Sequence, residues 1–337
     1  MKPVTMAVVL ILGLWYACLA VDAGSAPSLR LRDPWSTVFG GREVAFEVEI
    51  VTSDQEWEGR LGWSLSFGDR VVARREMAVR AKAGEPAVAS LAMSLPEVKE
   101  GVILGGVLAV TLTDAAGATL DTASKALRVF HENPFADRGA WLKNLNILLF
   151  DPTGRTTALF EQAGIPHRLL RDYNLPANEP GLWLVGEGVS FDEYRGLAQT
   201  LFQAASLGRQ VLCMAPASGS LAVPGLGSGQ EEWPVSIRLS GPAVIAELDK
   251  RLDAKDWQDC GPINVRGLAM KDPGVMTVLD PGEETKGWAW VRMDYTGGGG
   301  VNFCGIPIVS AWECGPTPRY LLLRLLEKME PRKEKEP

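Results

Sequence analysis

Two carboxylates in the second half of the chain follow short apolar runs, a position from which they could take part in chemistry. Asp151 comes directly after the run 145–150, and Glu187 follows the run 182–186. Two carboxylic acids on either side of a glycosidic bond are what hydrolysis of that bond normally requires. Carboxylates at strand ends also cap helices. The pair therefore indicates either a carbohydrate hydrolase or two structural caps.

Two further segments have the composition of a ligand loop. Residues 151–157 lie between a predicted strand and a predicted helix, where backbone N–H groups can hold an anion. The segment lacks the Gly-Lys-Ser/Thr ending of a phosphate loop, so the alternative is a tight turn capped by threonine. The run Gly297–Gly300 could also cradle a ligand, or could form a hairpin tip.

Several polar residues follow predicted strand ends in this half of the chain. In open α/β sheets, ligands bind beyond the carboxyl ends of the strands, where the strand order reverses. Arg155 favours an acidic or polyhydroxylated ligand, because its guanidinium donates paired hydrogen bonds. We therefore predict one ligand-binding cleft lined by Asp151, Thr153, Arg155, Glu187, Pro216 and Ser218.

The cysteines point to disulfide chemistry rather than to a metal site. No pair has Cys-x-x-Cys spacing, and the chain has only two histidines, so we expect neither a metal nor a cofactor. Cys213 lies within an apolar run and is expected to be a buried thiol. Cys304 and Cys314 flank a stretch rich in turn residues, which predicts a disulfide between them.

The amino terminus has the layout of a secretory signal peptide over residues 1–26. Lys2 precedes the apolar run Met6–Ala20, and small residues follow it. We expect the mature protein to begin between Val21 and Pro27 and to be secreted or periplasmic, with no stable membrane span after processing. The alternatives are a retained membrane anchor and a lipidated Cys18.

Length and charge restrict the class of protein. The chain of 337 residues is long enough for two domains, each with its own core. Its formal net charge of −7 and the lack of a clustered basic patch argue against a nucleic-acid binder, since phosphate binding needs clustered Lys and Arg.

Residues 28–130 have the period-two pattern of β-strands. Val44, Phe46, Val48 and Ile50 alternate with glutamates, which places one face in a core and the other in water. About seven short strands separated by turn signals predict an antiparallel, immunoglobulin-like β-sandwich, with Trp63 in its core. Residues 131–143 are polar, contain Pro and Gly, and are expected to form a linker.

Residues 144–330 follow a different pattern, in which continuous apolar runs alternate with helical segments. This pattern is typical of a parallel sheet covered on both faces. We expect helices over 156–163, 191–206 and 317–329 and late strands over 275–279, 288–294 and 300–305. The charged tail 331–337 is expected to be disordered.

The second half resembles the class I glutamine amidotransferase-like superfamily, a three-layer flavodoxin-like α/β fold. The resemblance rests on the strands at 145–150 and 182–186, the segment 208–216, the segment 299–303 and the leucine-rich closing helix. Active members place a nucleophilic cysteine on the turn after the third of these segments. Here that position is Ala215, Cys213 lies two residues earlier, and no histidine follows His167. The resemblance therefore implies a degenerate domain without glutaminase chemistry.

Together these features predict a secreted, non-catalytic binding or scaffolding protein, linked to carbohydrate processing because some secreted glycoside hydrolases use the same fold as an accessory domain. One alternative is a carbohydrate-active hydrolase that uses Asp151 and Glu187. The other is a structural component of an envelope complex. The expected partner is accordingly a carbohydrate or an envelope protein.

Overall fold

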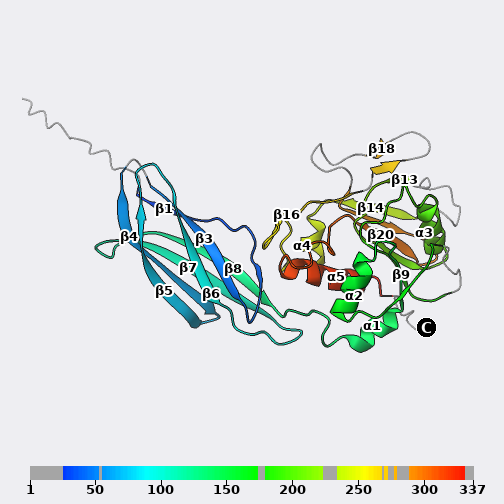
Figure 1. The fold of residues 1–337 in the computed structure, drawn as a ribbon, viewed down its shortest axis with the longest axis horizontal. Helices are drawn as coiled ribbons and strands as arrows, with labels where there is room; N and C mark the ends of the chain where they lie inside the picture. The colour runs from blue at the N-terminus through cyan, green and yellow to red at the C-terminus, as the bar shows by residue number, and fades with distance from the viewer. Residues whose placement is uncertain are drawn as a thin grey trace, which may run out of the picture.

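The structure of the chain is a computed structural model that describes residues 26–52, 55–173, 179–222, 234–267, 269–271, 277–278 and 288–330. The expected signal peptide and the expected disordered tail lie outside these residues, apart from Ala26. The chain is mostly β-sheet and forms two parts, with the strands of the first half on one side and a mixed helix and sheet assembly on the other (Figure 1).

Residues 28–130 form a β-sandwich of two sheets. One sheet has the order β1-β3-β6, formed by Ser28–Leu31, Glu43–Val51 and Ala87–Ser94. The other has the order β2-β8-β7-β4-β5, formed by Thr37–Phe39, Thr119–Phe130, Ile103–Asp114, Trp57–Phe67 and Arg70–Ala81. All pairs are antiparallel except β2 with β8, which is parallel.

The core of the sandwich follows the alternation in the sequence. Val44, Phe46, Val48 and Ile50 of β3 are buried, while the glutamates between them face outward or lie half-buried. Trp63 of β4 is only 6% exposed and belongs to the same core. The expected period-two faces are therefore confirmed for this strand.

The second part is organised around a seven-stranded sheet with the order β10-β9-β11-β12-β20-β19-β14. The first five strands run parallel, and the last two are antiparallel to their neighbours. The strands are His167–Leu169, Ile147–Phe150, Leu182–Val185, Gln210–Cys213, Gly300–Cys304, Trp290–Asp294 and Ser236–Ser240. Two small sheets accompany it: β13-β17-β18 (Ser220–Ala222, Ala269–Lys271, Thr277–Val278) and β15-β16 (Asp256–Trp257, Gly261–Pro262).

Helices cover both faces of the seven-stranded sheet. Alternate residues of its strands enter two cores, so that Leu149 of β9 belongs to one core and Leu148 to the other. The first core also contains buried residues of α1 (Gly139–Leu145), α2 (Arg155–Ala163), α4 (Val244–Leu248) and α5 (Pro316–Lys328), and the second those of α3 (Leu197–Ser206). A sheet buried on both faces explains why its strands read as continuous apolar runs.

Two sequence-based expectations about local structure need correction. The helix expected from Phe191 begins only at Leu197, after Gly196, whose φ is 94°. The expected linker contains the start of α1 and the buried Phe135, which is packed in the first core of the α/β part. Because most residues of this segment are polar, the sequence did not indicate that its few apolar residues pack in a core.

The glycine run near the end of β19 is packed rather than open. A Cβ on Gly299 would lie 2.1 Å from the carbonyl oxygen of Ala205, and one on Gly297 would lie 3.0 Å from that of Ser206. Gly300 also donates its backbone N–H to the Arg209 carbonyl at 2.9 Å. Gly297 and Gly299 let the backbone approach the turn after α3, and the run forms the tip of the hairpin between β19 and β20, as one of the two alternatives expected.

The disulfide predicted between Cys304 and Cys314 is wrong in one of its two cysteines. Cys314 is bonded to Cys260, 54 residues earlier, with their Cα atoms 5.5 Å apart. Cys304 lies on β20, is fully buried, and has a free thiol. A strand residue that faces the core cannot turn toward the segment before α5, whereas Cys260 lies in the turn between β15 and β16.

A hydrogen-bonded junction connects the sandwich to the α/β part. The Asp253 carboxylate accepts hydrogen bonds from the backbone N–H and the hydroxyl groups of Ser36 and Thr37, at 2.7–2.9 Å. The guanidinium of Arg319 on α5 donates to the Glu132 carbonyl at 3.1 Å and lies 4.7 Å from the ring centroid of Phe39. Both contacts join residues from the two parts of the chain.

Candidate functional site

The strand order reverses between β9 and β11, and the loops after β9, β11 and β12 carry the predicted ligand residues. Asp151 follows β9 and is only 5% exposed. One of its carboxylate oxygens accepts hydrogen bonds from the Thr157 N–H and hydroxyl at 2.8 and 3.0 Å, and the other accepts from the Thr153 hydroxyl at 2.8 Å. Asp151 thus holds the first turn of α2.

Glu187 follows β11 and is 3% exposed. Its two carboxylate oxygens accept hydrogen bonds from the backbone N–H groups of Val309 and Ser310, at 2.7 and 3.0 Å. Its own N–H donates to the hydroxyl of Thr156 at 2.8 Å. Glu187 therefore ties the loop after β11 both to α2 and to the chain after β20.

These contacts bear on the two interpretations of the carboxylate pair. Each carboxylate is buried and already accepts hydrogen bonds from groups of the protein, on both of its oxygens. Thr153 connects the two loops, because its hydroxyl also donates to the carbonyl oxygen of Glu187 at 3.3 Å. The arrangement caps and cross-links loops, which is the structural role that strand-end carboxylates often have.

The structure separates the remaining predicted ligand residues. Arg155 is exposed and has no ion pair within the described part of the chain. Pro216 is buried, while Ser218 is exposed and its hydroxyl lies 2.8 Å from that of Ser190. The exposed part of this edge is therefore a polar surface carrying Thr153, Arg155 and Ser218, with the carboxylates beneath it.

The loop after β12 joins the loop after β11 through its backbone. Gly188 donates its N–H to the carbonyl oxygen of Ala215 at 2.8 Å, and Ala217 donates to that of Val189 at 3.0 Å. Ala215 itself is fully buried. The side chain of Ala215, at the position where the resemblance would place a nucleophile, is thus a buried methyl group.

The two free cysteines are poor nucleophiles. Cys213 is 1% exposed, and burial raises the pKa of its thiol well above the ordinary value. Burial also raises the pKa of Cys304 to about 12. Both thiols therefore stay protonated near neutral pH, whereas the thiolate is the reactive form.

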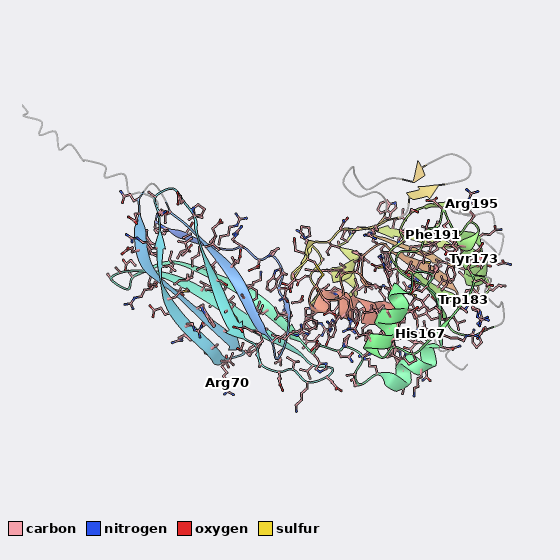
Figure 2. All side chains as sticks on the ribbon, viewed as in Figure 1. Arg70, His167, Tyr173, Trp183, Phe191 and Arg195 are labelled. Carbon is pink, nitrogen blue, oxygen red and sulfur yellow. A yellow bond between two sulfur atoms is a disulfide. The ribbon has the colours of Figure 1, made fainter. Side chains whose placement is uncertain are left out.

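Three aromatic side chains beside this edge were not singled out from the sequence. Phe150 of β9 packs edge-on against Tyr173 and Tyr194, with ring centroids 6.0 and 5.2 Å apart. The Tyr173 hydroxyl donates to the carbonyl oxygen of Arg195 at 2.9 Å, and Figure 2 labels both residues beside Phe191. Tyr173 and Tyr194 lie in loops and gave no periodic signal, so only the fold brings them to Phe150.

The part of the chain that the structure describes contains neither a group of metal-binding side chains nor a helix able to span a membrane. None of its groups of His, Cys, Asp and Glu side chains has an arrangement that could hold a metal ion. Within the same residues, every helix is too short or too polar to cross a membrane.

Comparison with known proteins yields only weak similarity. No family model matches the chain, and no curated protein sequence matches it. Similar solved structures include the sporulation control protein Spo0M from Bacillus subtilis, with 15% identity, a TM-score of 0.25, and coverage of 36% of this chain and 56% of that one.

Two other solved structures show comparable similarity. A cycloisomaltooligosaccharide glucanotransferase from Paenibacillus sp. has 11% identity and a TM-score of 0.28, over 57% of this chain and 28% of that one. The CARDB domain of the PF1109 protein from Pyrococcus furiosus has 11% identity and a TM-score of 0.24, over 32% and 92%. TM-scores this low carry no argument about fold or function.

Proposed function

We propose that the protein is an exported, non-catalytic binding or scaffolding protein. The observation that carries this proposal is the use of Asp151 and Glu187 as buried acceptors for backbone N–H and hydroxyl groups. A catalytic carboxylate must face the substrate, whereas these two face the protein. The buried Ala215 at the nucleophile position supports the same conclusion.

The proposal includes an immunoglobulin-like first domain and a degenerate amidotransferase-like second domain with a flavodoxin-like fold. The parallel order β10-β9-β11-β12-β20 supports it, because the same strands numbered along the chain read 2-1-3-4-5. Helices on both faces of the sheet are also typical of that fold. The disulfide Cys260–Cys314 supports export, since disulfides persist in oxidising compartments.

We place the ligand on the exposed polar edge above the two carboxylates. Arg155 and the hydroxyls of Thr153 and Ser218 are groups that hydrogen-bond a polyhydroxylated ligand, and the rings of Tyr173 and Tyr194 lie in neighbouring loops. A carbohydrate held there would be bound without turnover, because the carboxylates beneath are occupied.

A glycan-binding screen on the mature chain tests this placement. We expect binding without release of hydrolysis products, and about tenfold weaker binding for Arg155→Ala, since a hydrogen bond to a charged group contributes about 1.5–3 kcal/mol. Lys143→Ala, an exposed cation on α1, is the matched control and should bind as the wild type does. Unchanged binding by Arg155→Ala would move the site elsewhere, and steady turnover would favour the hydrolase.

A further inference from the structure

The outer edge of β5 is a long unpaired strand edge. β5 has twelve residues and is hydrogen-bonded to β4 on one side only; no other described residue forms a backbone hydrogen bond with it. In a strand at the edge of a sheet, the outward-facing N–H and C=O groups are a template for another strand. Natural edges are usually short, covered, charged, or interrupted by a proline or a bulge. β5 is long and contains no proline, but it is charged and its register with β4 shifts between Leu65 and Ser66.

The edge carries positive charge that the protein does not neutralise. Arg74 and Arg75, in the middle of β5, are exposed and have no ion-pair partner in the described part of the chain. Two other arginines nearby are paired, since Arg60 lies 3.4 Å from Glu76, and Arg80 lies 2.8 Å from Glu56. Arg70, the first residue of β5, also has no ion pair in the described part of the chain. Unpaired cations at one edge of a chain with net charge −7 favour an acidic partner.

The two arginines extend from opposite faces of the strand. Arg74 lies opposite Ser64 in the register with β4, on the solvent side of the sheet, whereas Arg75 lies opposite Trp63, on the core side. Arg75 is nevertheless exposed. A strand laid along β5 would therefore meet a guanidinium on each of its faces.

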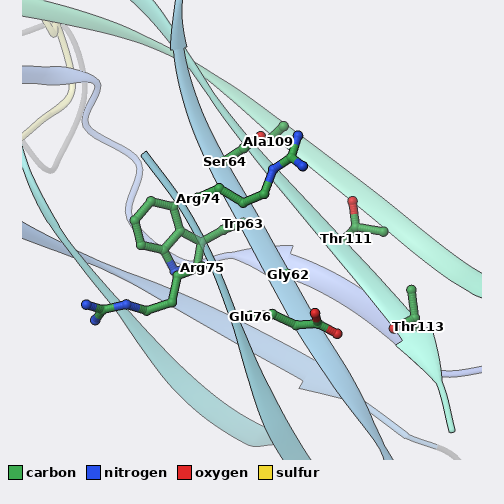
Figure 3. Close-up of a pocket in the computed structure, with 9 residues that line it drawn as sticks. All are labelled: Gly62, Trp63, Ser64, Arg74, Arg75, Glu76, Ala109, Thr111 and Thr113. Atoms are coloured by element: carbon green, nitrogen blue, oxygen red, sulfur yellow. The ribbon is translucent and has the colours of Figure 1, made fainter. Parts of the chain in front are cut away.

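A shallow depression lies on the solvent side beside Arg74 (Figure 3). Its volume is about 330 Å³, and its floor consists of small residues such as Gly62, Ser64 and Ala109. A Cβ on Gly62 would meet nothing closer than 3.9 Å, so the floor is open above the sheet. Thr111 and Thr113 add hydroxyl groups to its far side. The depression lies over β4 and β7, on the inner side of β5, so Arg74 borders open space there.

Two exposed side chains add apolar surface to β5. Val71 is 48% exposed and Met77 is 38% exposed. These exposed side chains lie on the same strand as the arginines, which suits a partner with both acidic and apolar residues. A second copy of this chain fits poorly, because β5 carries four arginines and one glutamate, and like charges opposite each other destabilise a strand pair.

We propose that β5 is a docking edge to which an acidic, extended segment of a partner protein adds as a sixth strand of the five-stranded sheet. Main-chain hydrogen bonds provide the affinity, and carboxylates beside Arg74 and Arg75 provide the selectivity. This inference goes beyond the ligand site of the α/β part and does not depend on it.

The experiment uses the mature chain and three synthetic peptides of ten residues. The first alternates Val and Thr around two central glutamates, the second replaces the glutamates by lysines, and the third carries N-methyl groups on alternate backbone amides. Fluorescence anisotropy measures binding, and hydrogen exchange locates it. We expect the first peptide to bind, to protect amides of β5, and to bind more weakly as salt is raised, because salt screens exposed charges.

Charge-reversal variants give the decisive comparison. Arg74→Glu/Arg75→Glu should bind the acidic peptide at least about tenfold more weakly, in line with the several kcal/mol that juxtaposed like charges cost. Lys99→Glu/Lys250→Glu makes the same change in net charge with two exposed residues elsewhere, and should bind as the wild type does. Equal thermal midpoints for the two variants would show that both are folded, and Arg155→Ala should retain peptide binding.

Three results would overturn the proposal. Equal binding of the N-methylated peptide would show charge attraction without strand addition. Binding of a sulfated hexasaccharide in place of the peptide, lost in Arg74→Glu/Arg75→Glu, would identify a polyanion site. Self-association in the ultracentrifuge that the same variant abolishes would make a second copy the occupant.

Discussion

At the scale of single residues, the carboxylate of Glu187 shows how a group suited to catalysis is used for structure. It accepts two backbone N–H groups from the chain after β20, and its own N–H is held by Thr156. Removing the carboxylate leaves these buried donors without an acceptor, and such a loss is costly because the donors cannot reach water. The residue thus contributes to stability from a position typical of a catalytic acid.

We predict that Glu187→Ala lowers the free energy of unfolding by about 3 kcal/mol, the scale for hydrogen bonds to a buried charged group. Urea unfolding followed by tryptophan fluorescence measures this. Glu193→Ala is the control, because Glu193 is exposed and its carboxylate accepts no hydrogen bond in the described residues; it should leave stability unchanged. A stable Glu187→Ala protein that has lost a glycan-cleaving activity would instead assign Glu187 a catalytic role.

At the scale of elements, Asp249 connects α4 to α5. The residue follows α4, and its carboxylate accepts hydrogen bonds from Arg251 and, at 3.0 Å, from Arg324 on α5. Burial opposes ionisation of this carboxyl group, but the hydrogen bonds from Arg251 and Arg324 outweigh it and lower the pKa from 3.8 to about 2. The ionised form is therefore favoured by the folded state.

The lowered pKa predicts how the stability depends on pH. The contribution of the Asp249 carboxylate to the free energy of unfolding is fully present above pH 3.8 and is lost as the pH falls through its folded-state pKa of about 2. Asp249→Asn should cost about 2 kcal/mol at pH 7, the equivalent of this shift, and the difference from the wild type should shrink between pH 4 and pH 2. Chemical denaturation across this range tests it, with the exposed Asp192→Asn as control; a difference independent of pH would contradict the assignment.

At the scale of the whole molecule, the two parts of the chain are joined by a polar junction. Asp253 accepts four hydrogen bonds from Ser36 and Thr37, more than 200 residues away, and Thr317 on α5 lies 3.2 Å from the Thr37 hydroxyl. Tyr320 on α5 donates its hydroxyl to the His131 carbonyl at 3.1 Å and packs against Phe130. A binding surface on either part is thereby held relative to the other.

We predict that Asp253→Ala uncouples the sandwich from the α/β part. Four donors lose their acceptor, which should lower the free energy of unfolding by about 3 kcal/mol and separate one cooperative transition into two. Differential scanning calorimetry and limited proteolysis near residues 131–138 measure both effects. Asp256→Ala is the control, since its carboxylate forms no hydrogen bond within the described part of the chain; a single transition in Asp253→Ala would argue against the coupling.

The sequence by itself determined the features that depend on local repetition. The alternation along β3 predicted its buried face, because successive side chains of a strand point to opposite sides. The apolar runs at β9, β11 and β12 predicted strands covered on both faces, and the leucines of α5 predicted its packing stripe. Such patterns need no knowledge of distant residues.

Only the tertiary structure decided the features that depend on which distant groups meet. The sequence does not show which groups the carboxylates of Asp151 and Glu187 contact. Only the positions of α2 and Val309 show that they accept hydrogen bonds from backbone N–H groups. Cys314 bonds Cys260 rather than Cys304 because the core side of β20 holds the nearer cysteine in place. The contact of Asp253 with Ser36 joins residues that are 217 positions apart. It forms because the two parts of the chain pack against each other, and no local sequence pattern predicts that packing.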